Sequence, residues 1–126
     1  MRTRIMATGM EPTRPLREFA RKCLSVIHRR HPEALVHADV FLEDLNGPKG
    51  GQDMSVKVRL RLRNGRMITI REVREDLHAA IALASRRAAF SVRQALEEGR
   101  RIDRREGRRA RRGGLTDPME AAAGAL

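Results

Sequence analysis

The sequence predicts an α+β fold with the element order β-α-β-β-β-α, in which one four-stranded mixed sheet has two helices packed on one face. Apolar residues alternate with polar ones in some segments, which is typical of strands with one buried face. In two other segments the apolar residues recur every three or four positions, which is typical of helices. A chain of 126 residues has room for one such domain and a tail.

The first strand is expected at residues 2–8, and the first helix follows it. Thr13 suits a helix N-cap and Pro15 suits the first turn, while His31 and Pro32 end the helical pattern. The apolar stripe of this helix consists of Leu16, Phe19, Ala20, Cys23, Leu24 and Ile27. A right-handed crossover through the helix makes the first and second strands parallel.

The second and third strands are expected at residues 36–43 and 54–63, and an Asn-Gly pair then marks a hairpin. A two-residue turn would point the following isoleucines away from the leucines of the third strand. A three-residue loop with Gly65 in the left-handed region instead brings Ile68 and Ile70 to the leucine face. Because a slip of one residue reverses every side chain, we predict the three-residue loop. The last three strands then form an antiparallel meander.

The second helix is expected to begin near Asp76, where the period of apolar residues becomes helical. Its stripe consists of Leu77, Ile81, Ala84, Ala88, Val92 and Leu96, with Ala80 and Ala95 beside it. We place the folded domain at residues 1–98 and a flexible, arginine-rich tail at residues 99–126, because the tail has few large apolar residues to bury. Arginine pairs recur in the tail every four residues, which would align them on one side of a helix if RNA neutralised their repulsion.

The chain is strongly basic, and its positive charge comes from arginine. The formal net charge is +11, with 24 arginines and three lysines. Arginine binds phosphate oxygens in pairs through its planar fork of donors, and a large basic excess in a small domain is typical of nucleic-acid-binding proteins. A genome rich in G and C is the alternative explanation for arginine in place of lysine, and the two explanations are compatible.

Residues suited to catalysis, metal binding or cofactor binding are not grouped in the sequence. The NGPKGG segment lacks P-loop spacing, the four histidines are scattered, and a single cysteine cannot form an internal disulfide. No run of about 18 apolar residues is present. We therefore expect a cytoplasmic protein that is not an enzyme and is monomeric when free. We expect it to bind no cofactor, metal or small-molecule substrate and not to associate with a membrane.

Asp39 and Glu43 share one strand face, and we interpret them as cross-strand partners of cations rather than as an acid–base pair. The cations are Lys57, Arg59 and Arg61. Two interpretations of Arg59 and Arg61 stay open: they contact RNA, or they only pair with these acids. Phe41 is the one aromatic residue expected on the open face of the sheet, so a fold that reads RNA by stacking bases is not expected. The remaining way to bind RNA is for arginine side chains to recognise its backbone and shape.

Two long stretches of the sequence carry a family resemblance: PTRPLREFARKCLSVI and REDLHAAIALASRRAAFSVRQAL. They resemble the first and second helices of the ribosome hibernation-promoting factor and ribosome-associated inhibitor family, also called the sigma modulation proteins. Asp76, Leu77, Ala80 and Ile81 fit the opening pattern of the family's second helix, and His78 replaces a typical aromatic residue. DLNGPKGGQD is similar to a loop found in a proteobacterial branch. The resemblance covers roughly residues 2–98.

The resemblance implies a domain that binds the small ribosomal subunit, occupies its mRNA and tRNA channel, and silences idle ribosomes under stress or in stationary phase without catalysis. It leaves open whether the chain promotes ribosome dimers or blocks single ribosomes. The alternatives are a general binder of structured RNA and a protein-binding regulatory module. A regulatory module would need an exposed apolar patch rather than an arginine face.

The resemblance also suggests which residues contact RNA. Arg17 matches an arginine of the family's first helix, and Arg87 falls where the second helix typically has lysine. Cys23 and Phe90 stand where relatives often have basic residues, and neighbouring or C-terminal cations can replace these. Lys49 lies between glycines, where it either touches a phosphate or is simply part of a glycine-rich loop. The candidate rRNA-binding residues are Arg17, Arg21, Lys22, Lys49, Arg86, Arg87, Arg93, Arg100 and Arg101.

Overall fold

The computed structural model describes residues 1–45 and 53–113, with side chains as far as residue 109. The elements in chain order are β1 (Arg2–Thr8), α1 (Arg14–Arg30), β2 (Leu35–Asp44), β3 (Met54–Leu62), β4 (Met67–Arg74) and α2 (Leu77–Gly113). The chain divides into two units, residues 1–92 and 93–126, and each is described by itself. The predicted element order is confirmed.

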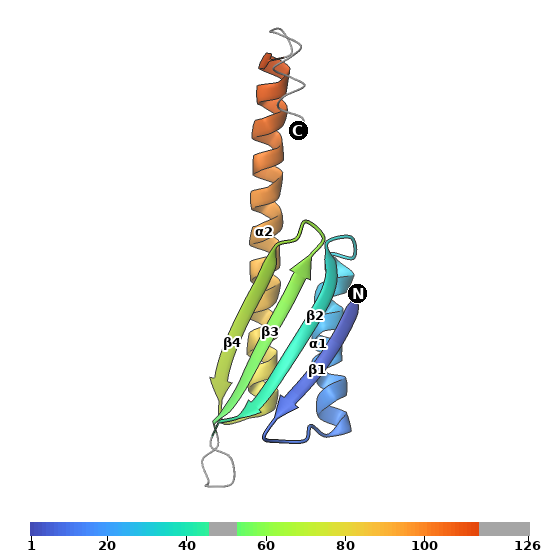
Figure 1. Cartoon of the computed structure of the whole chain (residues 1–126), viewed down its shortest axis with the longest axis vertical. Coiled ribbons are helices and arrows are strands. Elements are labelled where there is room, and N and C mark those ends of the chain that lie inside the picture. The colour runs from blue at the N-terminus through green and yellow to red at the C-terminus, as the bar shows by residue number, and fades with distance from the viewer. Residues whose placement is uncertain (46–52, 114–126) are drawn as a thin grey trace. The chain divides into compact units, whose positions relative to one another are not determined.

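The four strands form one sheet in the order β1-β2-β3-β4. Strand β1 runs parallel to β2, whereas the β2–β3 and β3–β4 pairs are antiparallel, as predicted. Within the first unit, α1 and the first turns of α2 cover one face of the sheet and leave the other face open (Figure 1). The buried apolar side chains of the strands, such as Val58 and Leu60, point toward these helices. The mixed sheet with two helices on one face is thus confirmed.

The hairpin between β3 and β4 has the predicted three-residue loop. The Leu62 amide donates to the Arg66 carbonyl at 2.8 Å, and the Gly65 amide donates to the Leu62 carbonyl at 2.9 Å. Gly65 has a φ of +89°, a backbone conformation that glycine adopts at little cost. Ile68 consequently pairs with Leu60 across the strands and is buried. The loop length therefore decides which side of β4 faces the core.

Helix α1 begins and ends where the sequence indicated. The Thr13 hydroxyl accepts a hydrogen bond from the Leu16 amide at 3.4 Å, and His31 is the C-cap. The residues of α1 that are fully buried are Leu16, Ala20, Leu24 and Ile27, while Phe19 is half-buried. The Phe19 ring lies 5.1 Å from the ring of His78 on α2, so a histidine makes the contact between the helices.

Residues 99–113 continue helix α2, so the first part of the segment that we expected to be a flexible tail is helical. Starting a helix is the costly step, and here the helix is already formed when the arginine-rich stretch begins. Gly99 and Gly107 each cost about 1 kcal/mol of helix stability, but arginine is a good helix former and no proline interrupts the stretch. Leu96 is half-buried rather than part of the fully buried stripe.

One polar group in the core of the first unit lacks a partner. Ser85 on α2 is 7% exposed, and its hydroxyl oxygen has no hydrogen-bond partner among the described residues. The neighbouring thiol of Cys23 on α1 is free. Burial raises the pKa of this thiol, and the charge of Lys22 opposes the rise only in part. The thiol is therefore a half-buried, small hydrophobic group rather than a nucleophile.

The substitution Ser85→Ala should increase the free energy of unfolding by about 1 kcal/mol, because it removes a buried hydroxyl that forms no hydrogen bond. Serine-to-alanine changes also improve helix propensity, so Ser25→Ala at an exposed position of α1 is the matched control. Urea denaturation of both variants measures the difference. If Ser85→Ala is less stable than Ser25→Ala, the hydroxyl has a partner that stabilises the fold.

Candidate nucleic-acid interface

The open face of the sheet is basic. Successive side chains of a strand point to opposite faces, so the residues between the buried ones point away from the helices. The cations on this open face are Arg2, Arg4, Lys57, Arg59, Arg61 and Arg71, and the acidic residues are Asp39 and Glu43. Six cations against two acids give this face a net positive charge over all four strands.

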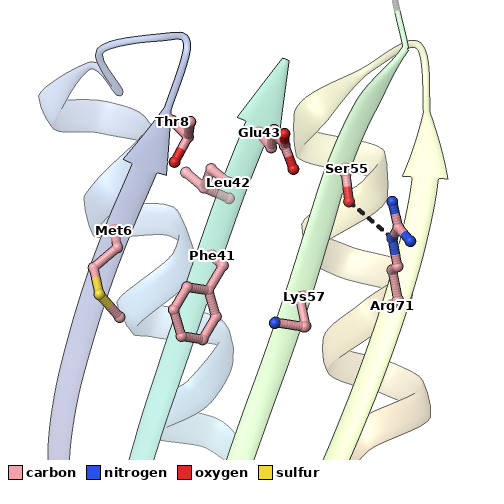
Figure 2. Close-up of a pocket in the computed structure, with 8 residues that line it drawn as sticks. All are labelled: Met6, Thr8, Phe41, Leu42, Glu43, Ser55, Lys57 and Arg71. Atoms are coloured by element: carbon pink, nitrogen blue, oxygen red, sulfur yellow. Dashed lines mark hydrogen bonds between the residues drawn. The ribbon is translucent and has the colours of Figure 1, made fainter. Parts of the chain in front are cut away.

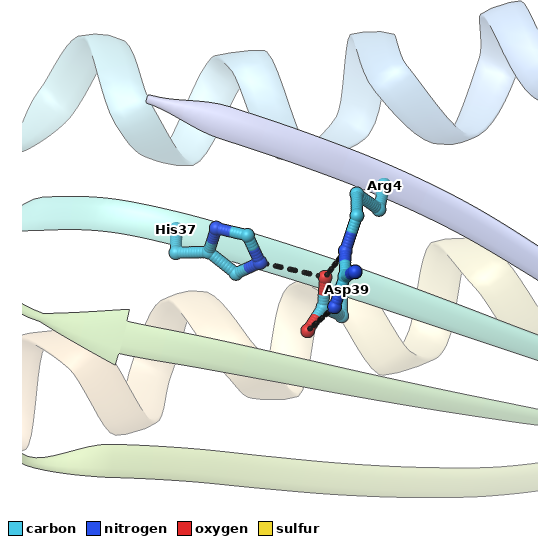
Figure 3. Close-up of polar contacts among 3 residues, drawn as sticks. All are labelled: Arg4, His37 and Asp39. Carbon is cyan, nitrogen blue, oxygen red and sulfur yellow. Dashed lines mark hydrogen bonds and ion pairs between the residues drawn. The ribbon is translucent and has the colours of Figure 1, made fainter.

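Asp39 is buried at the centre of a small polar network on the open face, and it is only 5% exposed. Its carboxylate accepts from Arg4 Nε of β1 at 3.1 Å and lies 2.8 Å from His37 Nε2 (Figure 3). Burial opposes ionisation of Asp39, but the hydrogen bonds and charges of Arg4 and His37 outweigh it and hold its pKa below the ordinary value. The Arg4 side chain remains largely exposed.

Our interpretation of the two acidic residues is therefore only partly right. Asp39 does pair across strands, but its cation comes from the parallel neighbour β1 and not from β3, because the register places Arg4 beside it. Glu43 lies opposite Ser55 of β3 and forms no salt bridge with a described residue. Arg59 and Arg61 likewise form no salt bridge with any described carboxylate, so the pairing explanation does not hold for them.

The Asp39 network should make the stability of the domain depend on pH. A carboxyl group whose pKa is lower in the folded state stabilises the fold above its unfolded pKa of about 3.9. This contribution is lost as the pH falls through the lower folded pKa. The variant Asp39→Asn should therefore be less stable than the parent by about 1–3 kcal/mol at pH 7, and the difference should shrink below about pH 4.

Urea denaturation at pH 7 and at pH 3 measures this difference. The matched control is Glu43→Gln, which removes an exposed carboxylate on the same strand and should change stability by less than about 0.5 kcal/mol. A stability difference between Asp39→Asn and the parent that is the same at both pH values would contradict the proposed role of the carboxylate.

A hollow of about 320 Å³ lies on the open face beside Phe41. Lys57 Nζ lies 4.6 Å from the centre of the Phe41 ring, and Arg59 Cζ lies 5.6 Å from it. Arg71 Nε donates to the Ser55 hydroxyl at 3.2 Å, which orients the guanidinium group along the rim (Figure 2). Met6 and Phe41 supply an apolar wall. The hollow thus combines an aromatic ring with cations, groups that bind nucleotides.

The helices, which cover the other face of the sheet, carry a second set of exposed cations. Arg17, Arg21 and Lys22 of α1 are all exposed and form no salt bridge with a described residue. Arg14, one turn before them, pairs with Glu18 at 3.2 Å. Three of the candidate residues therefore share one helix with their charged groups free to contact a polyanion.

Arg87 differs from the other candidates because it has a structural role. Its Nη1 lies 2.7 Å from a carboxylate oxygen of Glu72 and also donates to the Arg71 carbonyl at 3.0 Å. Glu72 is 8% exposed on the helix-covered face of β4, and it also pairs with Arg74 at 3.3 Å. The arginine fastens α2 to the edge of the sheet and keeps a buried carboxylate paired. Its neighbour Arg86 is exposed without such a partner among the described residues.

The remaining candidates lie outside the described part of the first unit. Arg93, Arg100 and Arg101 belong to the second unit, where all three side chains are exposed on α2. Lys49 lies outside the described residues.

Sequence reasoning missed three cations of the open face: Arg2, Arg4 and Arg71. The alternation that predicts the strands also assigns each residue to a face, so the signal was present. Within the described ranges, no group of three or more histidine, cysteine or acidic residues is arranged to hold a metal ion. None of the described helices has the length and apolar character needed to cross a bilayer.

A β-α-β-β-β-α domain with cations on its open sheet face and on its helices defines a small basic α+β module. Residues 3–99 match the family described as sigma 54 modulation protein / S30EA ribosomal protein. The chain therefore belongs to this family, a family of ribosome-associated proteins.

Two solved structures support the fold. The N-terminal domain of Thermus thermophilus Protein Y has a TM-score of 0.63 and 23% sequence identity, covering 75% of this chain and 98% of that one. A ribosomal subunit interface protein from Coxiella burnetii has a TM-score of 0.67 and 15% identity, covering 77% of this chain and 99% of that one. No curated protein matches the sequence significantly.

Proposed function

We propose that the chain binds the RNA of the small ribosomal subunit, occupies the channel that holds mRNA and tRNA, and so inhibits translation. The action is steric, because a rigid domain in that channel excludes the substrates of translation without making or breaking a bond. Its setting is the cytoplasm, where it would keep idle ribosomes inactive under stress or in stationary phase.

The observation that carries the proposal is the presence of cations on both sides of the domain in a chain of this family. The open sheet face has six cations and two acids, and α1 exposes Arg17, Arg21 and Lys22 on the other side. A domain that rests on a flat RNA surface gains counterion release from one side only. A domain enclosed by RNA gains it from both sides, which fits a channel better than an open surface.

The other candidate residues have graded roles in this proposal. Arg86, Arg93, Arg100 and Arg101 are exposed and would neutralise further phosphates. Arg87 would contribute less, because it is already paired with the Glu72 carboxylate. Lys49 is proposed as a phosphate contact from its sequence alone.

Sedimentation tests the proposal directly. Cell lysate is separated on sucrose gradients at low and high salt, and the fractions are probed for the chain. We expect it to migrate with small subunits or whole ribosomes at low salt and to be released at high salt, since phosphate contacts weaken steeply with salt. A signal confined to the top of the low-salt gradient would refute ribosome binding.

A translation assay tests the inhibitory step. Purified chain added to a cell-free system should reduce peptide synthesis in proportion to ribosome occupancy, and added mRNA should relieve the inhibition by competing for the channel. Full peptide synthesis at saturating occupancy would refute channel blocking while leaving ribosome binding intact. Equal affinity for naked duplex RNA and for ribosomes would instead indicate a general RNA-binding protein.

A further inference from the structure

The C-terminal part of α2 carries an array of arginines that lies outside the family match. The match ends at residue 99, and residues 100–109 are helical with described side chains. This stretch contains six arginines against two acidic residues, Asp103 and Glu106. The arginines are Arg100, Arg101, Arg104, Arg105, Arg108 and Arg109, and all six are exposed.

Helix geometry gathers the six arginines on one side. Successive residues of an α-helix are about 100° apart, so residues four apart lie nearly in line. One row consists of Arg100, Arg104 and Arg108, and the adjacent row consists of Arg101, Arg105 and Arg109. Together the rows cover about half of the helix circumference. The opposite half carries Ile102, Asp103, Glu106 and Gly107. We call the half with the two rows the arginine half of α2.

The arginine half is electrostatically unfavourable in the free chain. Like charges four residues apart destabilise a helix, and each row contains two such pairs. Among the described residues, none of the six arginines forms a salt bridge, and Arg104 Nε donates instead to the carbonyl of Arg100 at 3.3 Å. Repulsion therefore persists along both rows, and a polyanion that bound there would relieve it.

We propose that the arginine half of α2 binds the phosphates of duplex RNA and forms an anchor separate from the family domain. Each guanidinium group presents paired donors that match phosphate oxygens, and two rows can contact phosphates over a broad arc of the helix surface. A membrane surface is disfavoured, because the opposite half has one exposed apolar residue, Ile102, and no apolar stripe. The choice of RNA over DNA rests on the proposed function.

Fluorescence anisotropy with a short labelled RNA duplex tests the proposal on the full chain. In the first variant, Arg104→Gln, Arg105→Gln and Arg108→Gln remove three charges from the arginine half, while glutamine preserves helix propensity. Its affinity for the duplex should fall roughly 100-fold at 0.1 M salt. The slope of the logarithm of affinity against the logarithm of salt concentration should decrease by about three, because about three phosphate contacts are lost. Circular dichroism at 222 nm checks that the helix remains.

A second variant separates the arrangement of charge from its amount. The four changes Arg105→Asp, Asp103→Arg, Glu106→Arg and Arg108→Glu keep the composition and the net charge of +11 but place acids within the arginine half. Its duplex affinity should fall at least about tenfold. Wild-type affinity in this variant would overturn the proposal, because net charge alone would then explain binding. Unchanged affinity in the first variant would overturn it as well.

Three further ligands identify what the arginine half binds, and a sedimentation experiment separates this proposal from ribosome binding. The same anisotropy series with a DNA duplex, an acidic peptide and anionic vesicles should show weaker binding than RNA; tighter binding to any of them would overturn the choice of RNA. Both variants are also sedimented with small subunits. Variants that still co-sediment with small subunits but no longer bind the duplex would support a separate anchor. If the unmodified chain did not co-sediment with small subunits, that result would count against the proposed function only.

Discussion

Neutralising four cations of the open sheet face should weaken binding to the small ribosomal subunit about 1,000-fold. The substitutions are Lys57→Gln, Arg59→Gln, Arg61→Gln and Arg71→Gln. Each phosphate contact contributes roughly 1 kcal/mol, and a loss of about 4 kcal/mol corresponds to three powers of ten. The slope of the logarithm of affinity against the logarithm of salt concentration should fall by about three to four. Filter binding of labelled chain to purified subunits measures both quantities.

The result must be separated from a general loss of positive charge. The double variant Arg59→Gln and Arg61→Gln is compared with Arg29→Gln and Arg30→Gln at the end of α1, which changes the net charge equally. We expect the first pair to weaken binding roughly 30-fold and the second pair only a few-fold. Equal effects of the two pairs would show that the open face makes no direct contact and that only long-range attraction matters.

Shortening Ile68 to alanine should reduce the free energy of unfolding by about 2–4 kcal/mol, which is the largest stability effect that we predict. Ile68 is 8% exposed and faces Leu60 within the core. Its chain neighbour Met67 is 49% exposed on the other face of the same strand. The matched substitution Met67→Ala should therefore change stability by less than about 0.5 kcal/mol.

This pair of substitutions tests the hairpin register in solution. Urea denaturation curves of both variants give the two free energies, and far-ultraviolet circular dichroism confirms that both fold. A two-residue turn would reverse the order, so that Met67→Ala became the costly substitution. Such a reversal would show that β4 is shifted by one residue and that the arginines of β3 share a face with Ile68.

Much of the fold can be worked out locally. The Thr13 cap, the end of α1 at His31 and the loop around Gly65 all depend on residues close together in the chain. The alternation along β3 assigns Arg59 and Arg61 to the open face without knowledge of their neighbours. These features are predictable because helix and strand periods, caps and turns are short-range effects.

The partners of the charged groups could not be worked out in this way. Asp39 pairs with Arg4 rather than with Arg59, and Arg87 pairs with Glu72, a residue 15 positions away in the chain. Which of two neighbouring strands supplies a cation depends on sheet order and register, which are long-range properties. The helical state of residues 99–113 likewise depends on the turns of α2 that precede it.

The order of the elements, the buried side of each strand and the large excess of arginine can be worked out from the residues alone, because each follows from composition or from a period of a few residues. Which cations remain unpaired becomes clear only in the folded domain, since that depends on strands and helices that are distant in the chain. The distribution of these cations over both the open sheet face and the helices is such a long-range result. It follows from the packing of both helices on one side of the sheet, which leaves the other face without a covering helix.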